Sequence, residues 1–366
     1  MGSVKDLQVL APAYEDSPGE GSFVFSDRYS VFDWGEMPDH IDGKGAALAV
    51  MSAFNFEELE RRGIRTHYRG LVTEEGRLVR FADLPEGGGG CRVMRVALAR
   101  VYAPVVRTFL RSGNRPEVRY DYSLFTANRG RLNNFLVGLE VIFRNGLPLG
   151  SSVFAGIEKL KAASPDGGEP LQRLLANLGL KEEPVPGQML PRPIMSYSTK
   201  LESGDRNLNE AEAFEISGLE EENFRKLAEI GLAVNEFITE RAEQTGLAHY
   251  DGKIELVYDN GLVLADVVGT FDENRFASNN RQISKEVLRQ WYKRHQSDFP
   301  AACEEAKSGG AGWQSRCPVK PVNLPPELIR LASEMYQAGC NRYTGRRLFE
   351  VPELEEVLQA LEPYRR

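Results

Sequence analysis

Residues 249–266 read HYDGKIELVYDNGLVLAD, and this stretch predicts two strands joined by a tight turn. The Asn-Gly dipeptide at 260–261 lies between two apolar runs, which is a strong β-hairpin signal. We therefore expect strands over Lys253–Tyr258 and Leu262–Val268. Upstream, Glu220–Thr245 places its apolar residues on one side of a helix. Mixed strands and helices without regular βαβ alternation predict an α+β fold of two lobes, with a ligand cleft between them.

Shorter elements are expected around this hairpin. Apolar positions at helical spacing predict a helix over Gly45–Arg62, and a turn at 74–76 predicts a hairpin over Gly70–Phe81. Residues 164–193 are rich in proline, glycine and charge, so we expect a long loop that contains one short helix, Leu171–Leu178. Other expected elements are strands at Ser22–Phe25 and Phe135–Phe143, and helices at Lys285–His295 and Glu327–Ala338, the last ended by Gly339.

Ionisable residues concentrate on one face of the predicted hairpin. Side chains alternate along a strand, so Asp251, Lys253 and Glu255 share a face. Asp266 could meet Glu255 across the turn, and paired carboxylates can hold Mg²⁺ that also takes phosphate oxygens. The alternative interpretation is an edge hairpin with a solvated polar face.

Composition favours a small-molecule protein over several other classes. The 366 residues carry a formal charge of −8, whereas a broad nucleic-acid surface needs an excess of lysine and arginine. No apolar run is long enough to cross a bilayer, and residues 1–6 lack the pattern of a secretory signal. The four cysteines stand at no metal-ligand spacing. We expect a soluble cytoplasmic protein without nucleic-acid or membrane partners, and a homo-oligomer is compatible with the sequence.

Other clusters could contact phosphate, although each can also be explained as ordinary turn chemistry. Lys200 follows two hydroxyl residues and could neutralise polyphosphate. Arg144 at a strand end, with Gly150-Ser151 shortly after, offers bidentate guanidinium contact and backbone N–H donors. Two further candidates are the loop Ser26–Asp33 and the glycine-containing segment Gly2–Leu7.

The order of these clusters resembles the SAICAR synthetase family, whose members join aspartate to carboxyaminoimidazole ribonucleotide. The resemblance runs collinearly from residue 2 to about residue 295. The matching motifs are at Gly2–Asp6, Ser26–Asp33, Gly43–Gly45, Ser52–Leu59, Gly63–His67, Glu140–Asn145 with Gly150-Ser151, Pro193–Lys200 with Asn209-Glu210, Asp251–Glu255, Leu264–Asp266, and Asp272 with Arg275.

The resemblance implies an ATP- and Mg²⁺-dependent carboxylate–amine ligase that forms an acyl phosphate, and it implies roles for particular residues. The implied metal ligands are Glu255 and Asp266. The implied catalytic residues are Lys253, Lys200 and Asp251, and the implied ATP-binding residues are Lys5, Ser3, Glu140 and Lys200. The implied substrate-binding residues are Arg144, Ser151, Asp27, Arg28, Ser30, Asp272 and Arg275.

The chain also departs from the family pattern. Val267 stands where an acidic residue usually follows the hairpin aspartate, and residues 85–134 look like an insertion beside the expected adenine pocket. We expect a β-rich nucleotide-binding lobe over 1–136. A larger α/β lobe over 137–366 would carry the substrate and metal residues and a helical C-terminal extension. The departures leave open a paralogous amide ligase of specialised, nucleoside-type metabolism, and a non-catalytic nucleotide-binding protein.

Overall fold

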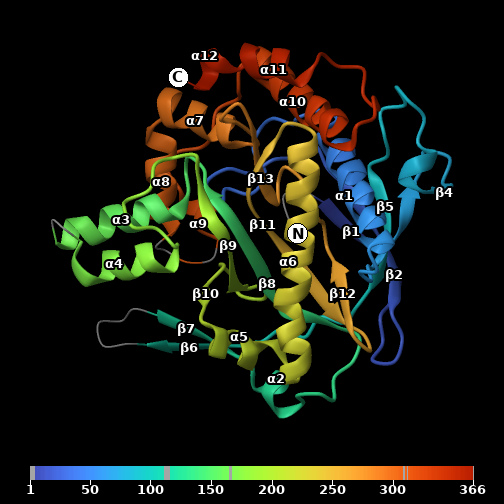
Figure 1. Ribbon diagram of the computed structural model, residues 1–366, viewed down its shortest axis with the longest axis vertical. Helices are drawn as coiled ribbons and strands as arrows, with labels where there is room; N and C mark the ends of the chain where they lie inside the picture. The colour runs from blue at the N-terminus through green and yellow to red at the C-terminus, as the bar shows by residue number, and fades with distance from the viewer. Residues whose placement is uncertain (1–4, 111–115, 165–166, 308–309, 311, 366) are drawn as a thin grey trace.

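The N-terminal lobe is an antiparallel sheet covered by one long helix. The computed structural model describes residues 5–110, 116–164, 167–307, 310 and 312–365. The helix α1, Lys44–Arg61, packs its apolar side chains on the sheet, where Phe23 and Met94 are buried beneath it (Figure 1). The sheet runs in the order β1 Lys5–Ala11, β2 Gly19–Phe25, β5 Val93–Leu98, β3 Tyr68–Val72 and β4 Leu78–Val79, and a short 3₁₀ helix, η1 Phe81–Asp83, follows β4.

The C-terminal lobe is built on a seven-stranded sheet. Helix α6, Glu221–Gln244, crosses the front of this sheet in Figure 1 and buries Leu227, Val234 and Ile238. The sheet runs in the order β10 Asn207–Leu208, β9 Gln188–Thr199, β8 Phe135–Leu147, β11 Ala248–Tyr258, β13 Asn274–Ser278 and β14 Arg281–Ile283, with β12 Leu262–Ala265 paired to β11. The two lobes confirm the predicted α+β class.

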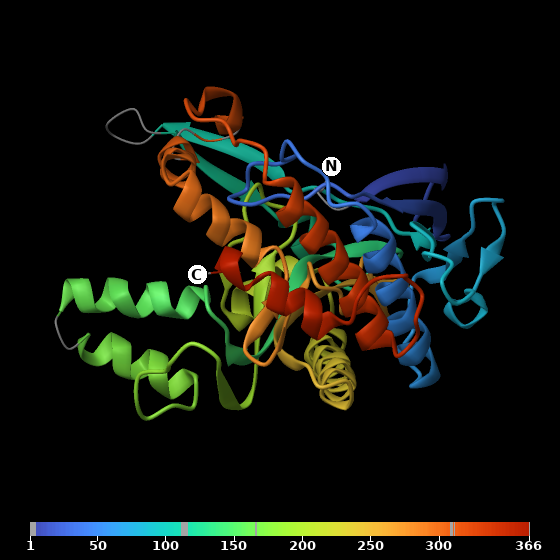
Figure 2. The ribbon, with the colours of Figure 1, turned by 90° about the horizontal axis from the view of Figure 1, so that it is seen from above.

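The remaining helices flank the two sheets. Helix α10, Pro326–Thr344, packs along α1, so the C-terminal part of the chain reaches the N-terminal lobe (Figure 2). The other helices are α2 Ser123–Ala127, α3 Ser152–Ala163, α4 Gly168–Asn177, α5 Glu210–Ser217, α7 Glu286–His295, α8 Asp298–Lys307, α9 Trp313–Arg316, α11 Leu354–Ala360 and α12 Glu362–Arg365. Within the described residues, no helix is both long enough and apolar enough to span a membrane.

The hairpin predicted around residue 260 is confirmed, although its second strand is shorter than expected. Strand β12 ends at Ala265, because Asp266 turns the backbone into the left-handed region with φ 61°. The predicted helices over 45–62 and 220–245 are confirmed as α1 and α6. The predicted hairpin over 70–81 forms from β3 and β4.

Three sequence-based expectations were wrong about helices and loops. Helix α3 was missed, and residues 188–193 belong to β9 rather than to a loop. Gly339 does not end a helix: α10 continues to Thr344, and Gly345, with φ 72°, is its C-cap. A Cβ at Gly339 would lie 2.7 Å from the ring of Phe271, so this glycine permits close packing inside the helix.

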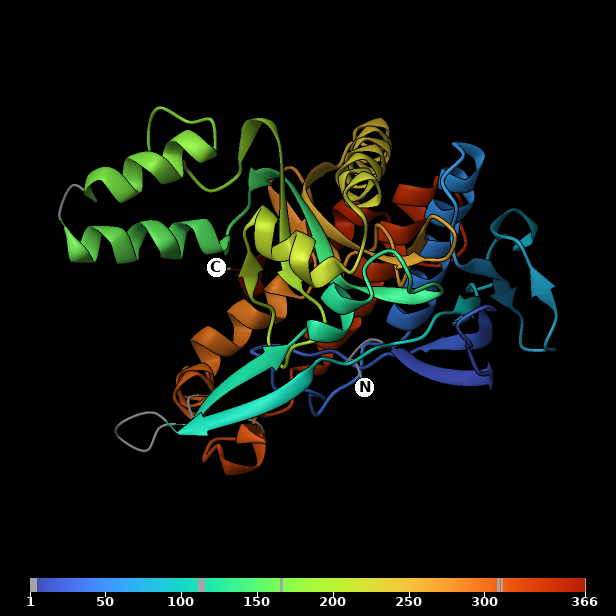
Figure 3. The same cartoon turned by 90° about the horizontal axis from the view of Figure 1, so that it is seen from below.

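The expected insertion over 85–134 was also placed too early. Strand β5 lies between β2 and β3 in the N-terminal sheet, so residues 93–98 complete that sheet. After it, β6 Val105–Leu110 and β7 Pro116–Asp121 form a two-stranded ribbon outside both larger sheets (Figure 3). The segment that departs from the two-lobed core is therefore this ribbon and α2.

Candidate active site

Two lysines and two glutamates form a compact ion-pair cluster on the C-terminal sheet. Glu255 on β11 pairs in register with Glu140 on the neighbouring β8, so both carboxylates lie at the same level. Lys200 Nζ lies 2.5 Å from Glu255 Oε1 and 3.6 Å from Glu140 Oε1. Lys253 Nζ lies 2.6 Å from Glu140 Oε1. The predicted shared face of the hairpin strand is thus filled by alternating positive and negative charge.

Asp266 extends this cluster to the N-terminal lobe. Lys5 on β1 places its Nζ 2.7 Å from Asp266 Oδ1. The ring of His67, at the start of β3, lies with its Nε2 3.1 Å from the backbone oxygen of Asp266. Asp266 therefore sits at the boundary between the lobes, where an N-terminal strand and a C-terminal hairpin meet.

The two hairpin carboxylates influence each other electrostatically. Burial raises the pKa of Glu255, and the charge of Asp266 raises it further, against the opposing effect of Lys200. Burial also opposes ionisation of Asp266, but Lys5 brings its pKa below the ordinary value. For Lys200, burial opposes the charge, but Glu255 raises its pKa overall, so Lys200 remains a cation. A cation bound between the two carboxylates would relieve their repulsion.

This donor set fits Mg²⁺. Mg²⁺ in proteins is usually held by one or two carboxylates together with substrate phosphates, and it keeps several waters. Glu255 and Asp266 supply two hard oxygen donors whose charges already interact. Among the described residues, no three or more His, Cys, Asp or Glu side chains gather as a metal-binding group, so phosphate oxygens would have to complete the coordination.

A second group of residues forms a cationic cavity beside the cluster. Asp251 Oδ1 accepts a hydrogen bond from Arg275 Nε at 2.8 Å, and Arg144 stands opposite Asp251 on β8. Burial lowers the pKa of Arg144, against the opposing charge of Asp251, and its guanidinium has no hydrogen-bond partner among the described residues. Ser151 caps α3 by accepting from the backbone N–H of Val153 at 3.4 Å. A helix N-terminus beside two guanidinium groups is suited to bind a phosphate.

Sequence reasoning missed part of this cavity. Its volume is about 480 Å³, and besides Arg275 it is lined by three cations of α7 and its N-cap: Lys285, Arg289 and Lys293. Their spacing of four residues puts them on one side of a helix. That spacing was a signal that could have been used. Four carboxylates, those of Asp251, Asp272, Glu273 and Glu286, line it as well, and Arg144 and Ser151 adjoin the lining residues Asp251 and Gly150. Glu273, 3.5 Å from Lys253, was also missed.

Four predicted substrate-binding residues, Asp272, Asp27, Arg28 and Ser30, have partners within the protein. Asp272 is buried, lies 2.8 Å from Lys44 Nζ, and accepts from the Tyr336 hydroxyl at 2.7 Å, so it joins α1 to α10. Burial opposes its ionisation, but Lys44 lowers the pKa of Asp272 to about 2. The carboxylate of Asp272 is therefore held by these two partners, and its predicted contact with substrate stays a prediction.

The three predicted substrate-binding residues of the loop 26–33 also have partners within the protein. Asp27 accepts from the backbone N–H of Gly45 at 2.9 Å and pairs with Arg92, so it anchors the start of α1. Ser30 accepts from the backbone N–H of Gly35 at 3.1 Å. Arg28 donates to Asp6 at 2.8 Å, next to Lys5. Ser3 lies outside the described residues.

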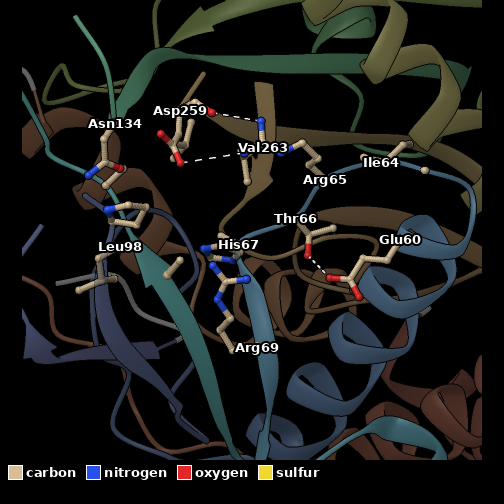
Figure 4. A pocket seen from close by; sticks show the side chains of 15 residues that line it. Glu60, Ile64, Arg65, Thr66, His67, Arg69, Leu98, Asn134, Asp259 and Val263 are labelled. Carbon is tan, nitrogen blue, oxygen red and sulfur yellow. Dashed lines mark hydrogen bonds and ion pairs between the residues drawn. The ribbon is translucent and has the colours of Figure 1, made fainter. Parts of the chain in front are cut away.

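His67 also lines a separate pocket of about 380 Å³ (Figure 4). It lies between the end of β5, the loop after α1 and the tip of the β11–β12 hairpin, and its walls include Leu98, Val257 and Val263. Because Val257 and Val263 pair two residues further along the hairpin than Glu255 and Ala265, this pocket continues along the same strands as the ion-pair cluster.

Fold and site together describe a two-lobed α+β protein with charged side chains gathered where the lobes meet. A family model described as SAICAR synthetase matches residues 10–96 and 130–306, and the ribbon and α2 fall between the two matched parts. The chain belongs to the SAICAR synthetase family and is a ligase of that family.

Individual relatives agree with this assignment. A protein of Archaeoglobus fulgidus is 42% identical, over 99% of this chain and 98% of its own length. A phosphoribosylaminoimidazole-succinocarboxamide synthase of Thermoplasma volcanium is 31% identical, over 80% of this chain and 82% of its own length. The SAICAR synthase of Saccharomyces cerevisiae in complex with SAICAR shares the fold, with a TM-score of 0.58, 22% identity, and coverage of 95% of this chain and 94% of that one.

Proposed function

We propose that the protein uses ATP and Mg²⁺ to join L-aspartate to carboxyaminoimidazole ribonucleotide, giving SAICAR for purine biosynthesis. The observation that carries this proposal is the cluster of Lys5, Lys200 and Lys253 with three carboxylates, directly beside a cationic cavity. The name of the Thermoplasma relative and the product bound to the yeast enzyme support the choice of substrates.

The proposed ATP site is the ion-pair cluster. Glu255 and Asp266 would hold Mg²⁺, which supplies charge neutralisation for the phosphate oxygens when bound. Lys5 and Lys200, which neutralise these carboxylates in the structure, would then turn to the phosphates. Lys200 and Lys253 keep their charge in this buried setting, so they can stabilise negative charge as it moves during phosphoryl transfer.

The proposed chemistry has two steps. A carboxylate oxygen of the ribonucleotide attacks the γ-phosphorus of ATP, the bond to ADP breaks, and an acyl phosphate forms. The amine nitrogen of aspartate then attacks the acyl carbon, phosphate leaves with the bonding electron pair, and the nitrogen loses a proton to give the amide. Closure of the cleft would protect the acyl phosphate from water.

The cationic cavity would bind the ribonucleotide. Arg144, Ser151 and Arg275 would hold its 5′-phosphate, and α7 would add Lys285 and Arg289. Asp251 holds Arg275 in place through the guanidinium–carboxylate contact. The carboxylate to be activated would then lie towards Lys253, two residues further along the same face of β11.

A coupled ADP-release assay with product mass tests this proposal. The mixture contains carboxyaminoimidazole ribonucleotide, ATP, Mg²⁺ and one amino acid at a time. We expect ADP release only with aspartate, together with a product of the mass of SAICAR. Aspartate-independent turnover, or ATP binding without turnover on any amino acid, would contradict it and favour a paralogous ligase with another carboxylate substrate. The apolar, buried Val267 beside Asp266 is the feature that favours such a paralogue.

A further inference from the structure

The C-terminal part of the chain packs on the segment between β2 and α1, residues 26–43, which we call the substrate loop. Asp39 in this loop accepts from Asn323 at 2.5 Å and from the backbone N–H of Leu324 at 2.7 Å. Ser333 and Gln337 of α10 both donate to the backbone oxygen of Asp42. These contacts come from residues beyond 306, where the matched family region ends.

Two neighbouring residues of the substrate loop have an unfavourable backbone conformation. Phe32 and Asp33 both have φ 57°, in the left-handed region that residues with a Cβ seldom adopt. Such conformations persist only where surrounding contacts determine them, and they concentrate at functional sites. The neighbouring contacts therefore show what holds the loop in place.

An aromatic cluster holds the loop from the C-terminal side. The ring of Trp34 packs edge-on against Phe299 of α8, with 5.2 Å between centroids, and against Trp313 of α9, at 5.8 Å. Phe32 contacts Phe299 as well, at 5.8 Å. Lys320 lies over the other side of the Trp34 ring, at 5.0 Å. Edge-to-face aromatic pairs of this kind fix orientation as well as burying area.

Polar contacts fix the strained residue itself. Lys307 at the end of α8 places its Nζ 2.7 Å from Asp33 Oδ2, and Gln314 of α9 donates to the backbone oxygen of Asp33 at 3.1 Å. Lys307 also lies 3.6 Å from Glu304 within α8, a contact that does not involve the loop. The side chain and the backbone of Asp33 are thus held by two different helices.

The other end of the substrate loop reaches the ion-pair cluster. Arg28 donates to Asp6, the residue after Lys5, and Lys44 donates to the backbone oxygen of Arg28 at 3.1 Å. Lys44 in turn pairs with Asp272, which lines the cationic cavity. The loop therefore runs from the aromatic cluster to the point between the proposed ATP site and the proposed ribonucleotide site.

We propose that α8 and α9 form a clamp that positions the substrate loop as the wall of the amine-substrate site, with Trp313 and Lys307 as its positioning residues. This inference rests on the proposed function. The guanidinium of Arg28 lies between the proposed sites of the two anionic substrates. An amino acid with a second carboxylate would need a cation there to pair with that carboxylate. Loosening the clamp raises the KM for the amine substrate more than the KM for ATP or the ribonucleotide.

Steady-state kinetics with each substrate varied in turn tests the clamp. For Trp313→Ala we expect the KM for aspartate to rise about tenfold, since the ring contact with Trp34 and the cation–π contact with Lys307 are lost, together worth on the order of 1.4 kcal/mol. Because Asp33 is largely exposed, its ion pair with Lys307 is weak, so we expect Lys307→Gln to raise the KM for aspartate only about twofold to fivefold. Glu304→Gln, which removes the other partner of Lys307, leaves all three KM values unchanged. Equal rises for all three substrates would overturn the clamp as a device specific to the amine site.

Limited chymotryptic digestion tests the clamp independently of which substrates the enzyme uses. Chymotrypsin cleaves after aromatic residues, so Phe32 and Trp34 report loosening of the loop itself. We expect faster cleavage between residues 26 and 43 in Lys307→Gln than in Glu304→Gln, with the site identified by mass. Equal cleavage in these two variants would overturn the clamp, even if the wild-type enzyme used other substrates than those proposed.

Discussion

Two groups of lysine–carboxylate pairs in this molecule have the same chemistry and different surroundings. Lys44 and Asp272 lie between α1 and α10 with side chains 0% and 2% exposed, and Tyr336 completes the enclosure. Lys5 and Asp266 lie at the lobe boundary with side chains 17% and 21% exposed, beside the interacting Glu255. The enclosed pair is almost inaccessible to solvent, whereas the boundary cluster is accessible enough to exchange its lysine contacts for a metal ion and phosphates in the proposed site. Burial therefore separates the proposed ligand site from a structural contact that a sequence motif does not distinguish.

Asp266→Asn should produce the largest effect, on turnover. We expect the rate of ADP release to fall at least about thousandfold, the scale of losing one preorganised charge in an active site. The free energy of unfolding should change by less than about 1 kcal/mol, because the Lys5–Asp266 pair is partly exposed. Glu222→Gln, on the exposed face of α6, is the matched control and should leave both quantities unchanged. An active Asp266→Asn enzyme would remove Asp266 from the metal site.

Asp272→Asn should act on stability instead. Removing one partner of an enclosed pair leaves Lys44 buried and uncompensated, so we expect about 3 kcal/mol lower free energy of unfolding in urea. Tyr336→Phe removes only the hydroxyl that donates to Asp272 and should cost about 1 kcal/mol. If Asp272→Asn unfolded like the wild type but lost turnover, Asp272 would be a substrate contact after all.

The dependence of stability on pH should give the smallest of the three effects. An unfolded aspartate ordinarily binds its proton near pH 3.9, whereas in the folded protein the pKa of Asp272 is about 2. The contribution of about 2.6 kcal/mol is therefore fully present above pH 4 and is lost as the pH falls towards 2. The difference in unfolding free energy between wild type and Asp272→Asn should shrink over this range. A difference that stayed constant would mean that Asp272 is not ionised at neutral pH.

The hairpin and its charged face could be predicted because they depend on local signals. The Asn-Gly turn and strict alternation decided which side Asp251, Lys253 and Glu255 share, and the structure brings Lys253 and Glu255 into one cluster with Glu140. The family motifs added Lys200, whose cluster could otherwise be explained as ordinary turn chemistry.

What the sequence could not predict depends on partners far along the chain. The motif that contains Asp272 reads the same whether its carboxylate faces a substrate or a lysine. Only the packing of α1 and α10 decides which partner the carboxylate meets. This packing brings Lys44, far before Asp272 in the sequence, and Tyr336, far after it, to the same carboxylate. The prediction that Gly339 ends a helix failed for the same reason. This glycine accommodates the ring of Phe271 inside the helix instead.

The central claim, that the boundary cluster is the MgATP site, is tested most directly by titration calorimetry of ATP binding with and without Mg²⁺. We predict tight binding only with Mg²⁺, and loss of this Mg²⁺ dependence in Glu255→Gln, because the substitution removes one of the two proposed metal ligands. Equal affinity with and without Mg²⁺, or an unchanged Mg²⁺ dependence in Glu255→Gln, would contradict the claim.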